Sequence, residues 1–189
     1  MEKIGKGGRT MKQRIIICLT AALVTMAACS TGDDDTTIAG INSENINDLT
    51  CKVQYVVNVD SIISTYYDLV VTYYDIDGKE LSDTIKDGKW KYVSPMVPFN
   101  DAPDKFLCNI IGTKKVEVPK LTQDYYALCY QCDAVVAFSR NDGTIVRTIR
   151  SATPEAMNQL INKASFDDML SSGNSLVICR LECTKEVKD

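Results

Sequence analysis

The chain has 189 residues, of which 21 are Lys or Arg and 25 are Asp or Glu, and it contains no histidine. The lack of histidine excludes Ser-His-Asp and Cys-His nucleophiles, zinc sites built on imidazole and haem held by histidine. Carboxylate chemistry of the kind that glycosidases use is still possible. No residue spacing pairs two carboxylates across a cleft, so we expect no catalytic residue, no metal site and no cofactor.

The first 28 residues have the organisation of a secretory signal peptide. Lys12 and Arg14 precede an apolar stretch from Ile15 to about Val24. This stretch is too short to span a bilayer, which needs about 20 apolar residues. Met26-Ala27-Ala28-Cys29 follows and resembles the lipobox of bacterial lipoproteins, with Met26 where that family prefers Leu. The resemblance implies that Cys29 is lipidated and begins the mature chain; the alternative is a secreted protein in which Cys29 has no such role.

Two further features belong to this targeting region. Met11-Lys12-Gln13-Arg14 is a compact basic start, so we expect translation to begin at Met11 rather than Met1. Asp33-Asp34-Asp35 follows Cys29 closely, and in lipoproteins of the Bacteroidetes lineage such an acidic cluster resembles the signal for export to the cell surface. The alternative is a solvated acidic linker. We therefore expect a protein held in the outer membrane by lipid and exposed at the cell surface.

The rest of the chain has the size of one domain. Without residues 1–28 it has 161 residues, with 16 basic and 24 acidic ones and no basic cluster. Nucleic acid is therefore not expected as a partner, because phosphate binding needs a positive surface. Residues 29–49 are rich in Ser, Thr, Asp and Asn and predict an acidic flexible tether. Residues 50–189 form the expected domain, and the lipid on Cys29 is its contact with the membrane.

Most of this domain predicts short strands. Residues 51–59 alternate apolar and polar side chains, which is typical of a half-buried strand. Residues 66–75 are apolar on both faces and predict a central strand. Further strands are expected at 79–85, 89–93, 105–111, 114–118, 124–138, 144–150 and 175–183, with a strand break at Gly112.

Turn and helix signals separate these strands. Hairpin turns are expected at Asp75–Lys79, Asp87-Gly88 and Asn141-Asp142-Gly143, and a loop is expected around Pro95, Pro98 and Pro103. One helix is expected at 154–162, with Thr153 as N-cap and Pro154 at the first helical position. Its apolar face would contain Met157, Leu160, Ile161 and Ala164, and a broken second turn would reach Gly173.

Eight to nine short strands with frequent turns predict an antiparallel β-sandwich. The segment 66–143 resembles the immunoglobulin-like or fibronectin-type domains of small Bacteroidetes surface lipoproteins. The resemblance rests on Leu69–Gly78, on Lys89-Trp90-Lys91 and on the Tyr-rich strand before Asn141. It implies a mainly β fold, an immunoglobulin-like β-sandwich with one short helical insertion before the last strand. It implies no functional residues, since such domains serve many roles.

Six cysteines lie in the expected domain, and three interpretations are open for them: Cys51, Cys108, Cys129, Cys132, Cys179 and Cys183. The pairs Cys129-x2-Cys132 and Cys179-x3-Cys183 resemble zinc ligands, but residues three apart on a strand point to opposite faces. Disulfides are possible in an exported protein. Strand parity places most of these cysteines beside apolar neighbours, which favours buried thiols in the core with one disulfide at most.

The aromatic residues suggest a ligand surface. Adjacent tyrosines on a strand would direct one ring of each pair outward, where a glycan or a protein could bind an aromatic-rich sheet face. The alternative is that these tyrosines are half-buried strand residues. The set comprises Tyr66, Tyr67, Tyr73, Tyr74, Trp90, Tyr125, Tyr126 and Tyr130. Asp75-x-Asp77-Gly78 also resembles half of a calcium loop, although the turn already explains these residues.

These observations predict a lipid-anchored envelope protein with a binding or structural role and no catalysis, and one such role is that of an accessory to the capture of glycans or peptides. Two alternatives are open. One is a carboxylate-based hydrolase, which would need two facing acids in a cleft. The other is a subunit of a surface fibre or oligomer that assembles through an open sheet edge.

Overall fold

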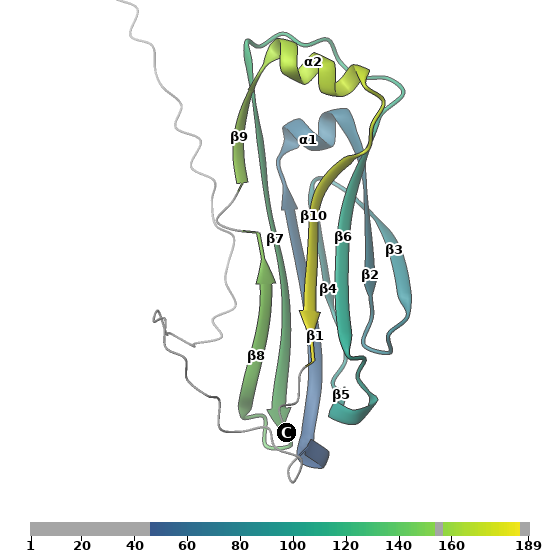
Figure 1. Ribbon diagram of the computed structural model, residues 1–189, viewed down its shortest axis with the longest axis vertical. Coiled ribbons are helices and arrows are strands. Elements are labelled where there is room, and N and C mark those ends of the chain that lie inside the picture. Colours follow the sequence, from purple (N-terminus) through teal and green to yellow (C-terminus); the bar gives the residue numbers. More distant parts are fainter. Residues whose placement is uncertain (1–45, 154–156, 186–189) are drawn as a thin grey trace, which may run out of the picture. The chain divides into compact units, whose positions relative to one another are not determined.

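The computed structural model describes residues 46–153 and 157–185, whose strands form two antiparallel sheets (Figure 1). The prediction of a mainly β chain is confirmed. The first sheet has the order β4-β1-β7-β8, with β5 beside β1 and β9 beside β7, and the second has the order β10-β6-β2-β3. The expected signal peptide, the lipidation site Cys29, the start at Met11 and tether residues 29–45 lie outside the described residues.

The element bounds are as follows. The first sheet contains β1 (Leu49–Val59), β4 (Lys89–Val93), β5 (Val97–Pro98), β7 (Tyr125–Arg140), β8 (Ile145–Ala152) and β9 (Met157–Asn162). The second contains β2 (Tyr67–Tyr74), β3 (Glu80–Ile85), β6 (Lys105–Lys114) and β10 (Leu176–Thr184). The helical segments are η1 (Ile46–Asp48), α1 (Ser61–Tyr66), η2 (Phe99–Asp101) and α2 (Lys163–Ser171).

The inner faces of the two sheets share one core. On β1, every second residue from Leu49 to Val59 is buried, and β7 shows the same alternation from Tyr126 to Phe138 except at Tyr130, which is half-buried. Aromatic rings join the layers: Tyr55 of β1 lies 5.9 Å from Tyr73 of β2, between ring centroids. A period of two is the pattern that a sheet with one buried face requires. The expected alternation in 51–59 and 124–138 is therefore confirmed.

The chain enters and leaves the domain at the same end of the sheets. Leu49, at the start of β1, pairs with Arg140 at the end of β7, and the Lys185 N–H donates to the Asp104 carbonyl just before β6. β1 has 11 residues, and at about 3.3 Å per residue it spans about 35 Å. Both α-helices lie at the opposite end (Figure 1). The α2 end is thus about 35 Å from the point where the chain enters the domain.

Helix α2 covers the core at that end. Phe166 is fully buried, and its ring contacts Tyr66 at 5.1 Å and Tyr126 at 4.8 Å between centroids. Asn162 is the N-cap, because its side-chain oxygen accepts from the Ser165 N–H at 2.9 Å. Leu170 is buried one turn after Phe166. This helix is held by its apolar face rather than by helix propensity, as expected for nine residues.

The helix predicted at 154–162 is wrong. Met157–Asn162 forms β9, which pairs with Tyr125–Tyr130 of β7, while residues 154–156 lie outside the described part of the chain. Within β9, Leu160 is 68% exposed and Ile161 is 8% exposed, which is strand alternation. The unpaired half of β7 offers backbone partners, and this pairing overrides a weak helix preference. The Thr153 hydroxyl accepts from the Cys132 N–H at 3.1 Å.

The strand break predicted at Gly112 is also wrong. β6 continues through Gly112 to Lys114, and no strand forms at 114–118. Gly112 packs against β2: a Cβ built there would lie 3.2 Å from the Tyr67 Cβ and from a Leu69 methyl group. Glycine here permits close approach of a neighbouring strand rather than ending one. The inner position of β2, between β3 and β6, is confirmed.

Two glycines with positive φ give a stability prediction. Gly88 has φ +69°, and a Cβ there would lie 2.1 Å from the Val59 carbonyl oxygen, whereas Gly143 has φ +85° and open space. We expect Gly143→Ala to cost about 1 kcal/mol from backbone strain alone. We expect Gly88→Ala to cost about 3 kcal/mol, because it also displaces the Val59 N–H bond to the Gly88 carbonyl. Urea unfolding midpoints measure both; equal losses would contradict this account.

Candidate functional site

A pocket of about 310 Å³ lies between α2 and the segment that follows β6. Its charged and polar lining comprises Lys114, Lys120, Lys163, Asp167 and Ser171. Its apolar lining comprises Val118, Pro119, Leu121 and Leu170. The three lysines come from β6, from the segment after it and from the first residue of α2, so the fold brings them together from distant parts of the sequence.

Both walls of this pocket are fixed by hydrogen bonds. Lys115 donates through its backbone N–H to the Tyr66 carbonyl at 3.0 Å and through Nζ to the Ser64 carbonyl at 2.7 Å. At the other end of the same segment, the Lys163 N–H donates to the Asp124 carbonyl at 2.9 Å. Segment 115–124 is thus tied to α1 at one end and to α2 at the other. The pocket is preformed, which lowers the entropy lost when a ligand binds.

The pocket has an excess of positive charge. Its lining includes three lysines and one acidic residue, Asp167. Ion pairs found within residues 46–153 and 157–185 join Lys105 to Glu182, Arg150 to Asp133 and Lys185 to Asp104. None of these pairs uses a pocket lysine. Three lysines around one pocket attract an anionic ligand, and the apolar lining residues can contact its carbon skeleton.

A second hollow, of about 420 Å³, lies at the opposite end of the sheets and is lined by Asp48, Leu49 and Arg140–Asp142. Its Asp142 carboxylate already accepts from the Thr144 N–H at 2.8 Å, and this bond holds the pKa of Asp142 below its usual value. Asp48 and Asp142 oppose the one cation, Arg140. This hollow is larger, but its polar groups serve the β7–β8 turn and the start of β1, so we prefer the pocket beside α2.

The expected row of aromatic side chains is mostly inside the core. Tyr66, Tyr67, Tyr73 and Tyr126 are each 5% exposed or less, whereas Tyr125 is 59% exposed. Tyr66 ends α1 and Tyr67 begins β2, so strand parity does not hold across this pair and both rings point inward. Among the described residues of the expected row, Tyr125 is the one that stands as a large exposed ring.

The open edge between β3 and β4 carries a polar contact with the core aromatics. The Asp83 carboxylate accepts from Trp90 Nε1 at 3.2 Å and from the Tyr73 hydroxyl at 3.4 Å. Burial and the neighbouring Asp83 charge raise the pKa of Tyr73 to about 12, so this hydroxyl stays protonated and donates. Asp83 therefore satisfies the hydrogen-bond donors of Trp90 and Tyr73 at this edge.

The cysteines lie on the strand faces that the alternation of side chains predicts. Cys51, Cys108, Cys132, Cys179 and Cys183 are buried free thiols, and burial raises the pKa of Cys51 and of Cys108 to about 12. Cys129 is half-buried on the opposite face of β7 from Cys132. No group of three or more Cys, Asp or Glu side chains in the described residues could hold a metal ion.

The exception to strand parity is β10. Val177 is 66% exposed although the sequence predicts that it shares a face with Cys179, which is 8% exposed. A β-bulge between these two residues causes the difference, since the register slips there and Ile178 and Cys179 are both buried.

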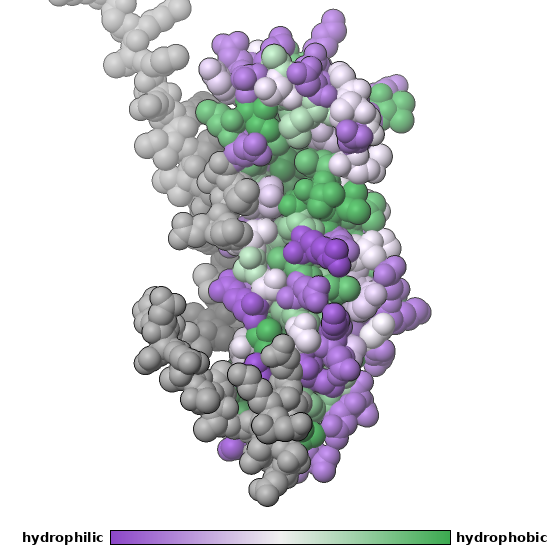
Figure 2. All heavy atoms as spheres, viewed as in Figure 1, coloured by the Kyte–Doolittle hydropathy of each residue, from purple (hydrophilic) through white to green (hydrophobic). Residues whose placement is uncertain are grey.

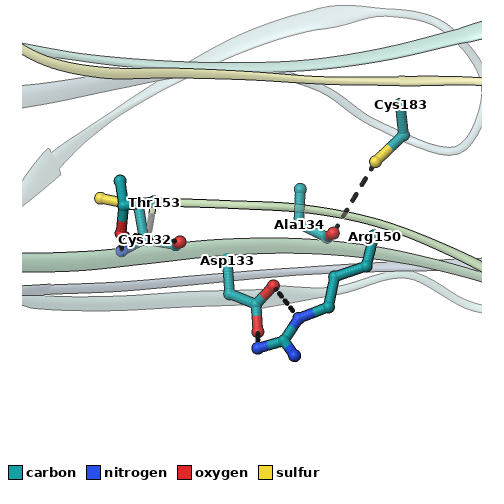
Figure 3. Close-up of polar contacts among 6 residues, drawn as sticks. All are labelled: Cys132, Asp133, Ala134, Arg150, Thr153 and Cys183. Atoms are coloured by element: carbon teal, nitrogen blue, oxygen red, sulfur yellow. Dashed lines mark hydrogen bonds and ion pairs between the residues drawn. The ribbon is translucent and has the colours of Figure 1, made fainter. Parts of the chain in front are cut away.

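The candidate acids serve structural contacts. Asp75 Oδ1 accepts from the Asp77 and Lys79 N–H groups, at 3.0 and 2.8 Å, which accounts for the calcium-like pattern as a turn. Asp133 forms a bidentate pair with Arg150 of β8, at 2.9 and 2.7 Å (Figure 3). This pair ties β7 to β8 on the outer face of the first sheet.

The outer face of the second sheet carries an apolar row. Val70 and Val177 both pair with Ile111, from β2 and β10 respectively, and the three side chains are 38%, 66% and 41% exposed in the order Val70, Val177, Ile111. Figure 2 shows this face with an apolar patch in its upper half and hydrophilic side chains around it. A row of exposed apolar side chains on the outer face of a sheet is typical of a contact surface.

Sequence reasoning missed the pocket because its lysines are dispersed. Lys114, Lys115 and Lys120 lie close together in the sequence. This local density of lysines was the signal that could have indicated the pocket. Lys163 joins them only because β9 returns the chain to the start of β7.

Comparisons with known proteins add no relatives. No protein-family model, no curated protein and no solved structure matches the chain. Within residues 46–153 and 157–185, no helix has the length and apolar content needed to cross a bilayer.

Proposed function

We propose that this protein is a lipid-anchored lipoprotein of the outer membrane, exposed at the cell surface, whose immunoglobulin-like β-sandwich binds a ligand without catalysis. The lipobox-like Met26–Cys29 and the acidic residues after it support the anchor and the surface location. The two antiparallel sheets with a common core support the sandwich.

The position of the lysine-lined pocket carries this proposal. The chain enters the domain at Ile46, and the pocket lies at the α2 end, about 35 Å along β1. In a protein anchored through Cys29, the tether joins the domain at Ile46. The pocket is then at the end of the domain opposite this attachment, where the tether does not obstruct a ligand.

The ligand that fits best is an acidic glycan. Lysines bind carboxylate or sulfate groups, Asp167 and Ser171 can accept hydrogen bonds from sugar hydroxyls, and Leu121 and Leu170 can contact the apolar face of a ring. One carboxylate in the pocket suits binding rather than hydrolysis, because glycosidases use two. An acidic peptide could donate its backbone N–H groups to Asp167 and Ser171, but it would lack the sugar ring that Leu121 and Leu170 can contact.

Self-association through the second sheet is the second candidate, and the exposed row of Val70, Ile111 and Val177 favours it. If this row is an interface between copies, we expect the mature protein in detergent to have the mass of a dimer or a larger oligomer, and Val177→Lys to shift it to a monomer. A monomeric mass for the unaltered protein would contradict this candidate.

Charge reversal in the pocket tests the proposed ligand. We expect Lys120→Glu and Lys163→Glu each to weaken binding of polygalacturonate about tenfold at low salt, because each replaces an attraction with a repulsion. Lys79→Glu is the matched control, since Lys79 is exposed in the β2–β3 turn at the other end of the domain. Affinity electrophoresis or calorimetry measures the change. Equal weakening by all three variants, preference for a neutral glycan, or preference for polyglutamate would contradict an acidic-glycan site.

Cys29→Ser tests the anchor. We expect this variant to stay unprocessed and to incorporate no labelled fatty acid, whereas the unaltered chain is recovered in the outer membrane with lipid on Cys29. Cys18→Ser is the matched control, because Cys18 lies in the apolar stretch of the expected signal peptide. Proteolysis of intact cells would remove the unaltered protein if it is surface-exposed. Lipid label that persists in Cys29→Ser would refute the assignment.

A further inference from the structure

One aromatic ring stands outside the core at the α2 end of the domain. Tyr125 is the first residue of β7, and 59% of its surface is exposed. It lies on the outer face of the first sheet, because the next residue, Tyr126, is buried in the core and successive strand residues point to opposite faces. The ring of Tyr125 is therefore accessible to a ligand.

Strand pairing places Tyr125 next to a residue of the lysine-lined pocket. Its register partner on β9 is Asn162, and the N–H of the following residue, Lys163, donates to the Asp124 carbonyl at 2.9 Å. In an antiparallel ladder this bond makes Tyr125 and Asn162 a non-hydrogen-bonded pair, whose Cα atoms lie about 4.5 Å apart. Lys163 lines the pocket, so the pocket begins one residue beyond the partner of Tyr125.

Two neighbours extend the exposed ring into an apolar surface. Leu160 of β9 is 68% exposed and lies opposite Ala127 of β7. Ala127 is on the same face as Tyr125, two residues along the strand, so Leu160 is the diagonal neighbour of the ring. Diagonal neighbours on a sheet are within reach of an aromatic side chain. Ala127 is exposed and small, which leaves space beside the ring.

The start of β7 is held in place by contacts with the core. The Gln123 N–H donates to the Tyr126 hydroxyl at 3.0 Å, and the Tyr126 ring lies 4.8 Å from that of Phe166 in α2, between centroids. Figure 1 shows β7, β9 and α2 together at this end of the domain. The backbone of Tyr125 and the α2 wall of the pocket are thus parts of one preformed arrangement, which lowers the entropy lost on binding.

We propose that Tyr125, Ala127 and Leu160 form a second sugar subsite, which binds the next ring of an acidic oligosaccharide whose charged group occupies the lysine-lined pocket. The inference rests on the acidic-glycan function proposed above and extends the ligand from one sugar to a chain of two or more. The C–H groups on one face of the sugar ring pack on the face of Tyr125, while Lys163 lies next to both subsites.

A chain-length series tests the second subsite. NMR titration measures the Kd of galacturonate and of trigalacturonate for the mature protein and its variants. We expect trigalacturonate to bind about tenfold more tightly than galacturonate, and Tyr125→Ala to remove this gain while changing the Kd of galacturonate by less than about twofold. Because Tyr125 is exposed, we expect the far-ultraviolet circular dichroism and the Tm of this variant to be unchanged.

Two further variants serve as controls. Tyr125→Phe keeps the gain, because the ring rather than the hydroxyl makes the contact. It also identifies the Tyr125 ring signals by their absence, and we expect these signals in the unaltered protein to shift with trigalacturonate and not with galacturonate. Val177→Ala changes neither Kd, because Val177 is exposed on the outer face of the other sheet.

The failure of this inference differs from the failure of the proposed function. A gain that persists in Tyr125→Ala, or equal weakening of both ligands by this variant, overturns the second subsite, and the lysine-lined pocket stands if Lys163→Glu still weakens galacturonate. A gain that is lost in Tyr125→Ala while Lys163→Glu changes nothing overturns the link between the two subsites. No binding of either ligand by the unaltered protein contradicts the acidic-glycan function and this inference together.

Discussion

The pairing of β1 with β7 is the interaction on which the rest of this domain depends. All 11 residues of β1 have register partners on β7, from Leu49 opposite Arg140 to Val59 opposite Tyr130. β7 is the longer strand, and its first residues extend beyond β1, where they pair with β9. Tyr126 in this extension contacts Phe166 of α2, at 4.8 Å between ring centroids. The length of β7 therefore builds the end of the domain on which the lysine-lined pocket lies.

Strand alternation and turn residues made much of this fold predictable. Val53, Tyr55 and Val57 face the core as their spacing indicates, and Gly78 and Gly143 have the positive φ that their turns require. The prediction of a helix at 154–162 was wrong because β9 pairs with a strand segment that lies about 30 residues earlier in the chain. A sequence pattern within a short window contains no information about such a partner. The strand break expected at Gly112 was wrong for a similar reason. Glycine is favoured there because Tyr67 and Leu69 of β2 lie beside it, and the neighbouring sequence contains no information about this contact.

The functional surface was harder to predict than the fold. Paired tyrosines suggested an exposed aromatic face, but the change from α1 to β2 between Tyr66 and Tyr67 turns both rings inward. The pocket is formed by three separate segments, and no spacing rule connects Lys114 with Lys163. Parity placed most buried cysteines correctly, but the bulge that exposes Val177 and leaves Cys179 buried could not be predicted from the sequence, because bulges depend on the neighbouring strand.

In the proposed lipoprotein, the charged residues are unevenly distributed, and the domain is long enough to separate the pocket from the point where the chain enters. The acidic residues Asp33–Asp35 lie in sequence next to the proposed lipid site, whereas the lysines of the pocket lie about 35 Å from Ile46 along the sheets. At physiological ionic strength the Debye length is about 8 Å, so a membrane on the Ile46 side has little electrostatic influence on these lysines. An anionic bilayer would then not compete with a soluble anion for the pocket. A net negative chain can therefore keep a positive binding site, provided that the site lies several Debye lengths from its anchor.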